Sequence, residues 1–230
     1  MKFIDAPSPN FDERDYKIDT LILHYTGMLT GEEALVRLRD ASAKVSAHYC
    51  VEENGDVYRL VDEANRAWHA GVASWQGEDN INARSIGIEI VNPGHAFGYP
   101  DFPDVQIEAV LALTKDICAR HKISPLRVLG HSDVAPRRKE DPGEKFPWGR
   151  FAAEGLALAP ADGDEYDGED VTFEEALQAL QAIGYDASTR DYSAGVLAFQ
   201  RRFCPRSLGQ GFNPHTKSAL IAIVKQSKQG

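Results

Sequence analysis

Residues 126–143 read LRVLGHSDVAPRRKEDPG, an apolar stretch that runs into a polar loop interrupted by two prolines. Leu126 to Leu129 has the composition of a short buried strand, and this strand delivers Gly130 and His131 at its C-terminal end. Open sheets commonly place functional groups at that edge. The following loop carries Asp141. The stretch therefore predicts a sheet with a polar site at the end of one strand.

The sequence before this stretch alternates short strands with helices. Strands are predicted at 20–25, 47–51, 57–61 and 85–91, and helices from about residue 30 and over 104–121. An Asn-Gly pair between the second and third of these strands predicts an antiparallel hairpin. Alternation along the fourth places Glu89 on the face opposite Ile88 and Ile90. We expect an α/β fold with a mixed central sheet flanked by helices.

The C-terminal part of the chain has a different pattern. Residues 161–170, ADGDEYDGED, are too acidic to bury a core and predict a solvated linker. Beyond them, Thr172 with Glu175 has the spacing of a capping box, and Asn213-Pro214 has that of a cap and first-turn proline. We expect a larger domain over 1–158, an acidic linker over 159–170, and a small all-α three-helix domain over 171–230.

Composition and charge narrow the class of protein. A net charge of −10 repels nucleic acid phosphates and anionic lipid headgroups, so neither nucleic acid nor a membrane is an expected partner. The first residues lack an apolar run of signal-peptide length. The three cysteines form no closely spaced pair. These features favour the cytoplasm, with the periplasm or cell envelope as the alternative.

Two histidines and one aspartate form a possible metal site. His24, at the end of the first predicted strand, joins His131 and Asp141 to give two imidazoles and one carboxylate. This is a ligand set with which proteins hold a catalytic Zn²⁺ while leaving one position open. A zinc hydrolase also needs a general base and a positive charge near the developing oxyanion. Glu89 and Lys139 suit these two tasks.

Five segments of the chain resemble a known family. They are LHYTG from Leu23, VSAHYCV from Val45, AWHAG from Ala67, SIGIEIVN from Ser85 and GHSDVAPRRKEDPG from Gly130. In order and spacing, over roughly residues 18–150, they look like the type 2 N-acetylmuramoyl-L-alanine amidases, relatives of the peptidoglycan-recognition proteins. The tail resembles the helical peptidoglycan-binding domain that follows the catalytic domain in some of these amidases.

The resemblance implies a zinc enzyme of peptidoglycan turnover or recycling. By this resemblance, His24, His131 and Asp141 correspond to the zinc ligands of the family, and Glu89 and Lys139 correspond to its catalytic residues. The implied reaction hydrolyses the amide between N-acetylmuramic acid, or its 1,6-anhydro form, and the L-alanine of the stem peptide. The resemblance implies a bacterial cell-wall hydrolase, whose expected partners are peptidoglycan or muropeptide fragments.

Three further residues are candidate substrate contacts. His48 and His69 lie in family-like segments, and either of them is equally well explained as a packed core histidine. Trp75 is a candidate to line a groove for a sugar ring.

The same residues are also compatible with two other functions. One is a noncatalytic module that recognises peptidoglycan. The other is a zinc peptidase that cuts within the stem peptide, although the chain lacks the HExxH signature of one large class of such enzymes.

Overall fold

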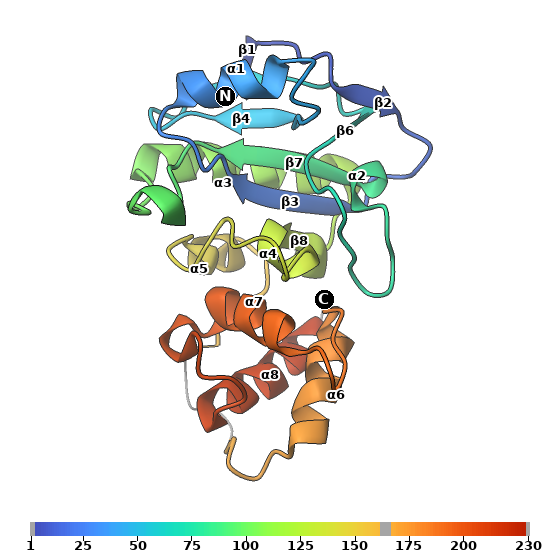
Figure 1. The fold of residues 1–230 in the computed structure, drawn as a ribbon, viewed down its shortest axis with the longest axis vertical. Helices are drawn as coiled ribbons and strands as arrows, with labels where there is room; N and C mark the ends of the chain where they lie inside the picture. Colours follow the sequence, from blue (N-terminus) through green and yellow to red (C-terminus); the bar gives the residue numbers. More distant parts are fainter. Residues whose placement is uncertain (1–2, 162–166, 229–230) are drawn as a thin grey trace.

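A computed structural model describes residues 3–161 and 167–228. Its centre is a six-stranded sheet in the order β1-β5-β4-β7-β3-β8 (Figure 1). The strands are β1 (Phe3–Asp5), β3 (Thr20–Tyr25), β4 (Tyr49–Val51), β5 (Val57–Arg59), β7 (Ser85–Ile90) and β8 (Val128–Gly130). A separate pair joins β2 (Phe11–Glu13) to β6 (Asn65–Ala67). The sheet is mixed, because β4 and β5 are antiparallel whereas β3 is parallel to both β7 and β8.

Five α-helices accompany this sheet in the part of the chain up to residue 161. They are α1 (Gly31–Arg39), α2 (Ile81–Arg84), α3 (Asp104–His121), α4 (His131–Val134) and α5 (Trp148–Ala153). Short 3-10 turns lie at η1 (His95–Phe97) and η2 (Pro125–Arg127). The hydroxyl of Thr30 accepts a hydrogen bond from the Glu33 N–H, which caps α1 where the sequence predicts its start.

The two faces of the sheet bury different sets of side chains. Leu23, Ile88 and Ile90 pack with the apolar face of α3, whose residue Ile117 belongs to the same cluster. Because successive side chains point to opposite faces, His24 and Glu89 project from the other face. The predicted orientation of Glu89 relative to its isoleucine neighbours therefore agrees with the structure.

The C-terminal part contains the three expected α-helices, α6 (Phe173–Ile183), α7 (Ser193–Phe203) and α8 (Pro214–Ser227), together with the 3-10 turn η3 (Pro205–Ser207). Thr172 and Glu175 form a reciprocal capping box, and the side chain of Asn213 accepts from the Thr216 N–H. The predicted fold class, α/β followed by a small helical region, is confirmed. Within the predicted linker, residues 162–166 lie outside the described residues.

The helical region packs directly against the sheet region (Figure 1). One apolar cluster contains Ile22 and Leu129 from the strands, Val134 from α4, and Leu180 and Phe199 from the C-terminal helices. This cluster contains residues from both sides of the predicted domain boundaries at 158 and 171. The division of the chain into domains stays a prediction.

The structure differs from the sequence-based expectations in several element bounds and in short elements that were not predicted, namely β1, β2, β6, α2, α4 and α5. The strand expected from Leu126 begins at Val128, because Pro125 starts a 3-10 turn that occupies the first positions. The hairpin strands are shorter than predicted, at 49–51 and 57–59. In the described residues, no helix has the length and apolar character that crossing a bilayer would need.

Candidate metal centre

Three neighbouring parallel strands bring the predicted metal ligands together. His24 lies on β3 directly beside Glu89 of β7. On the other side of β3, β8 ends at Gly130, and His131 is the first residue of α4. The carboxyl ends of parallel strands meet at one edge of the sheet, as the sequence suggested for the strand that precedes His131.

The ligand atoms of His24, His131 and Asp141 form a small triangle. The Nδ1 atoms of the two histidines are 2.9 Å apart. Oδ2 of Asp141 lies 3.2 Å from Nδ1 of His24 and 3.1 Å from Nδ1 of His131. Ligands held ~2.0–2.1 Å from a tetrahedral Zn²⁺ are about 3.3 Å from one another. The donor set and its spacing therefore fit zinc.

Hydrogen bonds on the far side of each imidazole select the tautomer that a metal needs. Nε2 of His131 lies 3.0 Å from the carbonyl oxygen of Ala70, to which it can only donate. Nε2 of His24 lies 3.0 Å from Nδ1 of His69. The Ser85 hydroxyl donates its own hydrogen to the carbonyl oxygen of Ile81, so it accepts from Nε2 of His69, at 3.2 Å. Nδ1 of His69 therefore accepts from Nε2 of His24. The Nδ1 lone pairs of His24 and His131 are then free to face the triangle.

Burial and charge keep His24 and Asp141 in the protonation states of metal ligands. Burial, followed by the charge of neighbouring His131, lowers the pKa of His24 to about 4. Burial alone would raise the pKa of Asp141, but its contacts with His131 and His24 hold that pKa well below its usual range. A neutral imidazole and an ionised carboxylate are the forms that coordinate a cation.

Glu89 is a buried acid beside this triangle. It is 9% exposed, and its Oε2 atom has no hydrogen-bond partner among the described residues. Burial, followed by the negative charge of Asp141, raises the pKa of Glu89 to about 8. A carboxyl group with a pKa near neutrality can both take up and release a proton at physiological pH.

A cavity of about 170 Å³ opens onto these groups. Its lining includes His24, His131, Asp141, Glu89 and Lys139, so the structure brings together all five predicted metal-binding and catalytic residues. The lining also includes Ala34, Arg37 and Leu38 of α1.

The candidate substrate residues are distributed differently. His69 lines the cavity and also contacts His24, whereas its contact with a substrate stays a prediction. His48 is fully buried, accepts a hydrogen bond from the Gly87 N–H and lies 2.9 Å from Nη2 of Arg14. These contacts belong to a packed core histidine, and His48 does not line the cavity.

Trp75 lies away from the metal ligands. Its side chain is 1% exposed and packs edge-to-face on Tyr185 of the helical region, with ring centroids 5.1 Å apart. The sugar contact predicted for Trp75 is therefore corrected, because no face of this ring is open to a ligand. An aromatic residue between predicted elements gave no indication that a distant segment covers it.

Tyr25 and Arg37 line the cavity but were not singled out from the sequence. Tyr25 directly follows His24, and its hydroxyl lies 3.0 Å from Nδ1 of His95. Its position next to a ligand was an available signal. Arg37 had no such signal, because a basic residue in the last turn of a helix is common for electrostatic reasons alone.

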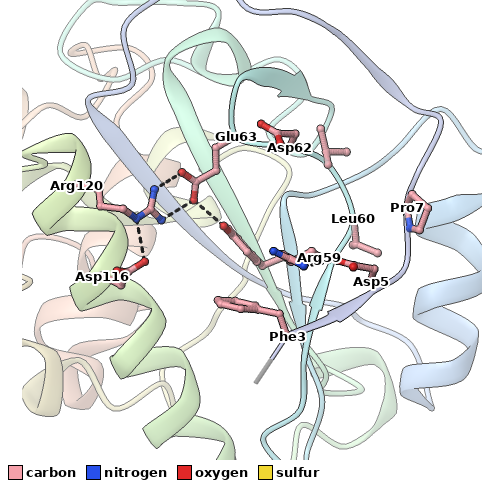
Figure 2. A pocket seen from close by; sticks show the side chains of 11 residues that line it. Phe3, Asp5, Pro7, Arg59, Leu60, Asp62, Glu63, Asp116 and Arg120 are labelled. Carbon is pink, nitrogen blue, oxygen red and sulfur yellow. Dashed lines mark hydrogen bonds and ion pairs between the residues drawn. The ribbon is translucent and has the colours of Figure 1, made fainter. Parts of the chain in front are cut away.

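A larger groove, of about 630 Å³, lies at the opposite edge of the sheet, between β1, β5 and α3 (Figure 2). Both of its arginines are paired with carboxylates: Arg59 pairs with Asp5, and Arg120 pairs with Glu63 and Asp116. Asp62 adds a further acidic group to the lining. The groove contains none of the candidate catalytic residues.

Comparisons with known proteins agree with this geometry. Residues 14–144 match the family model for N-acetylmuramoyl-L-alanine amidase. The Escherichia coli N-acetylmuramoyl-L-alanine amidase AmiD is 33% identical over 93% of this chain and 84% of its own length. The 1,6-anhydro-N-acetylmuramyl-L-alanine amidase AmpD of Enterobacter cloacae is 32% identical over 64% of this chain and 87% of its own.

The structural comparison gives the same neighbour. The E. coli AmiD structure, a complex with the substrate anhydro-N-acetylmuramic acid-L-Ala-D-gamma-Glu-L-Lys, superposes with a TM-score of 0.82 at 31% identity. The match covers 96% of this chain and 99% of that one. It therefore includes the C-terminal helices as well as the sheet.

Proposed function

This chain belongs to the N-acetylmuramoyl-L-alanine amidase family, and we propose that it hydrolyses the amide between N-acetylmuramic acid, or its 1,6-anhydro form, and the L-alanine of the stem peptide. The role is peptidoglycan turnover or recycling. The observation that carries the proposal is the convergence of His24, His131 and Asp141 beside the buried acid Glu89.

We propose Zn²⁺ as the metal, held by His24, His131 and Asp141. The triangle of two Nδ1 atoms and one carboxylate oxygen supports this choice, because it combines the ligand types and spacing of catalytic zinc. When bound, zinc supplies the positive charge that acidifies a water molecule and polarises a carbonyl group.

Glu89 is the proposed general base and acid. As the water oxygen forms its bond to the amide carbon, the Glu89 carboxylate takes up the proton that the water releases. The same proton then passes to the nitrogen of L-alanine as the carbon–nitrogen bond breaks. The products are a free lactyl carboxylic acid and a peptide with a free amino terminus. The raised pKa of Glu89 supports both transfers.

Lys139 is the proposed electrostatic partner of the carbonyl oxygen. It lines the cavity two residues before Asp141, so its ammonium can face the negative charge that develops as water adds. His69, which lines the same cavity, is proposed to orient His24 and to limit the space available to the substrate.

Two alternatives predict different behaviour. A noncatalytic recognition module would not need the complete ligand set that this chain retains. A zinc peptidase would use the same metal but cut a different bond, so only its products distinguish it.

The test combines metal removal with product analysis. The protein is stripped with a chelator and incubated with a purified anhydro-muropeptide, with and without added Zn²⁺. We expect activity only with zinc, and mass spectrometry should find anhydro-N-acetylmuramic acid and an intact peptide beginning with L-alanine. Shortened peptides would support the peptidase, and unchanged activity in the metal-free protein would exclude the proposed mechanism.

Asp141→Ala should abolish turnover. If the wild-type protein instead binds the muropeptide without any turnover, it is a recognition module.

A further inference from the structure

The segment that carries His131 has a buried carboxylate that belongs to no proposed catalytic step. Asp133 lies two residues after His131, in the same short helix α4, and is 1% exposed. Taking a carboxylate out of water is costly unless charged or hydrogen-bonding groups surround it. The partners of Asp133 therefore show what this segment depends on.

Two of these partners come from the C-terminal helical region. The N–H of Gly130 donates to Oδ2 of Asp133 from within the same segment, at 2.8 Å. The hydroxyl of Tyr185 donates to Oδ1, and Nη1 of Arg202 donates to Oδ2. The contacts thus span 52 and 69 positions of sequence.

Arg202 holds the segment at two points. Besides Asp133, it donates through Nη2 to the carbonyl oxygen of Val128, at 2.9 Å. These contacts lie on either side of His131, one at the start of β8 and one in α4. The guanidinium also lies over the ring of Trp148, 4.1 Å from its centroid. A planar group fixed by a ring and two acceptors leaves little freedom to the backbone that it binds.

Arg201, which precedes Arg202 in α7, approaches the segment that carries the proposed metal ligand Asp141. Nε of Arg201 lies 3.4 Å from a carboxylate oxygen of Glu144, which is three residues beyond Asp141. The two ligand-bearing segments are also joined directly, because the Ser132 N–H donates to the carbonyl oxygen of Asp141 at 2.9 Å. Helix α7 of the C-terminal region is therefore in contact with both segments.

We infer that Arg202 and Tyr185 are positioning residues for the metal ligand His131, and that the C-terminal helices act as a fixed support for the metal centre. The inference rests on the proposed metal function. A buried ion pair such as Asp133–Arg202 is by itself weak evidence for stability. The positioning role rests instead on the two contacts of Arg202, which lie on either side of His131. Residues that hold metal ligands in place typically contribute about 10–100-fold to metal affinity.

The test measures Zn²⁺ affinity by competition with a chromogenic chelator, on variants whose folding is checked by circular dichroism. Arg202→Met and Tyr185→Phe should each weaken Zn²⁺ binding, by about 10–100-fold for the former and less for the latter. Asp191→Asn is the matched control, because Asp191 pairs with Arg137 across the same contact between the two regions but is exposed. Its Zn²⁺ affinity should equal that of the wild-type protein.

The visible spectrum of the Co²⁺-loaded protein gives a second readout. Arg202→Met and Tyr185→Phe should shift its ligand-field bands, because the geometry of the ligands changes, whereas a purely structural role would lower the melting temperature alone. If Arg202→Met does not fold, Tyr185→Phe decides the question.

Wild-type affinity and spectrum in the folded Tyr185→Phe variant, and in Arg202→Met if that variant folds, would overturn the inference while leaving the proposed function intact. Failure of the wild-type protein to bind Zn²⁺ would instead overturn the proposed metal centre itself.

Discussion

Glu89 is buried and has a carboxylate oxygen without a hydrogen-bond partner among the described residues. A substitution of equal size can test its proton transfer without changing the packing. Glu89→Gln keeps the shape but cannot take up a proton. We expect kcat to fall by about 10²–10⁴-fold, which is the usual contribution of a general acid–base group. The measurement is steady-state turnover of an anhydro-muropeptide.

Zinc content separates this loss from damage to the metal centre. Glu89 is outside the ligand triangle, so the Gln variant should retain stoichiometric Zn²⁺ by elemental analysis. A variant that keeps zinc and also keeps full turnover would show that another group moves the proton.

Gly87 allows a close approach between β7 and the imidazole that supports His24. A Cβ atom at this position would lie 2.5 Å from Cγ of His69, whose ring is held between His24 and Ser85. We therefore expect Gly87→Ala to destabilise the protein by about 1–3 kcal/mol in chemical denaturation, the usual cost of overpacking. It should weaken Zn²⁺ binding as well, because the His69 ring must move.

Gly149→Ala is the matched control for that substitution. A Cβ at Gly149 meets no atom within 4 Å, and the residue lies in α5. Alanine there should leave stability unchanged or raise it by up to about 1 kcal/mol. Equal stability of the two alanine variants would contradict the proposed clash.

At the scale of elements, Glu63 ties the end of α3 to the edge of the sheet (Figure 2). Its carboxylate accepts hydrogen bonds from three side chains, those of Arg120, His121 and Tyr49. Burial would raise the pKa of Glu63, but these bonds lower it to about 2. Because the folded pKa is below the unfolded value of about 4.3, this stabilisation is complete above that pH and is lost as the pH falls towards 2.

Glu63→Gln should therefore lower the free energy of unfolding near pH 7 by about 1–2 kcal/mol, a figure already reduced for solvent screening. The difference between variant and wild type should shrink between about pH 4.3 and pH 2. Denaturant titrations across this range give the measurement. Glu154→Gln is the control, because it removes an exposed ion-pair partner of Lys115, a residue of α3. It should change the free energy of unfolding very little. A difference that does not change with pH would exclude the charge of Glu63 as its cause.

Signals that act over a few residues predicted the elements well. Thr172 caps its helix where its spacing with Glu175 indicated, and the helix predicted from about residue 30 begins at Gly31. The Asn-Gly turn joins an antiparallel pair, as expected. Local signals did not predict how β1 pairs, because its parallel partner β5 lies more than 50 residues away. Nor did they predict the environment of Trp75, which depends on Tyr185 from another region.

The same difference between local signals and contacts of distant segments applies to the site and to the whole molecule. His24, His131 and Asp141 were recognisable because each ends a strand or lies in a distinctive loop, and family spacing related them to one another. Asp133 lies within the same quoted loop, yet its partner Arg202 is one of two adjacent arginines in the last turn of a distant helix. A buried ion pair between distant segments leaves no periodic pattern in the sequence.

The shared core makes the C-terminal helices part of the folded unit, which leads to a prediction for a chain that ends at Ala161. Ile22, Leu129 and Val134 pack in one cluster with residues of α6, α7 and α8. Truncation would expose these side chains and remove two partners of Asp133. We expect a much lower melting temperature, aggregation and loss of turnover even on small soluble muropeptides.

A tail that serves only to anchor the enzyme on a polymer predicts a different result for the same truncated chain. Its activity on soluble anhydro-muropeptides would persist, and only the digestion of intact sacculi would fall. Assays of both substrates, alongside light scattering, therefore distinguish the two roles. Supplying residues 167–230 as a separate chain extends the test, because packing across the shared core predicts that the added helices restore soluble-substrate activity, whereas a tethered anchor cannot act once the covalent link to the enzyme is broken.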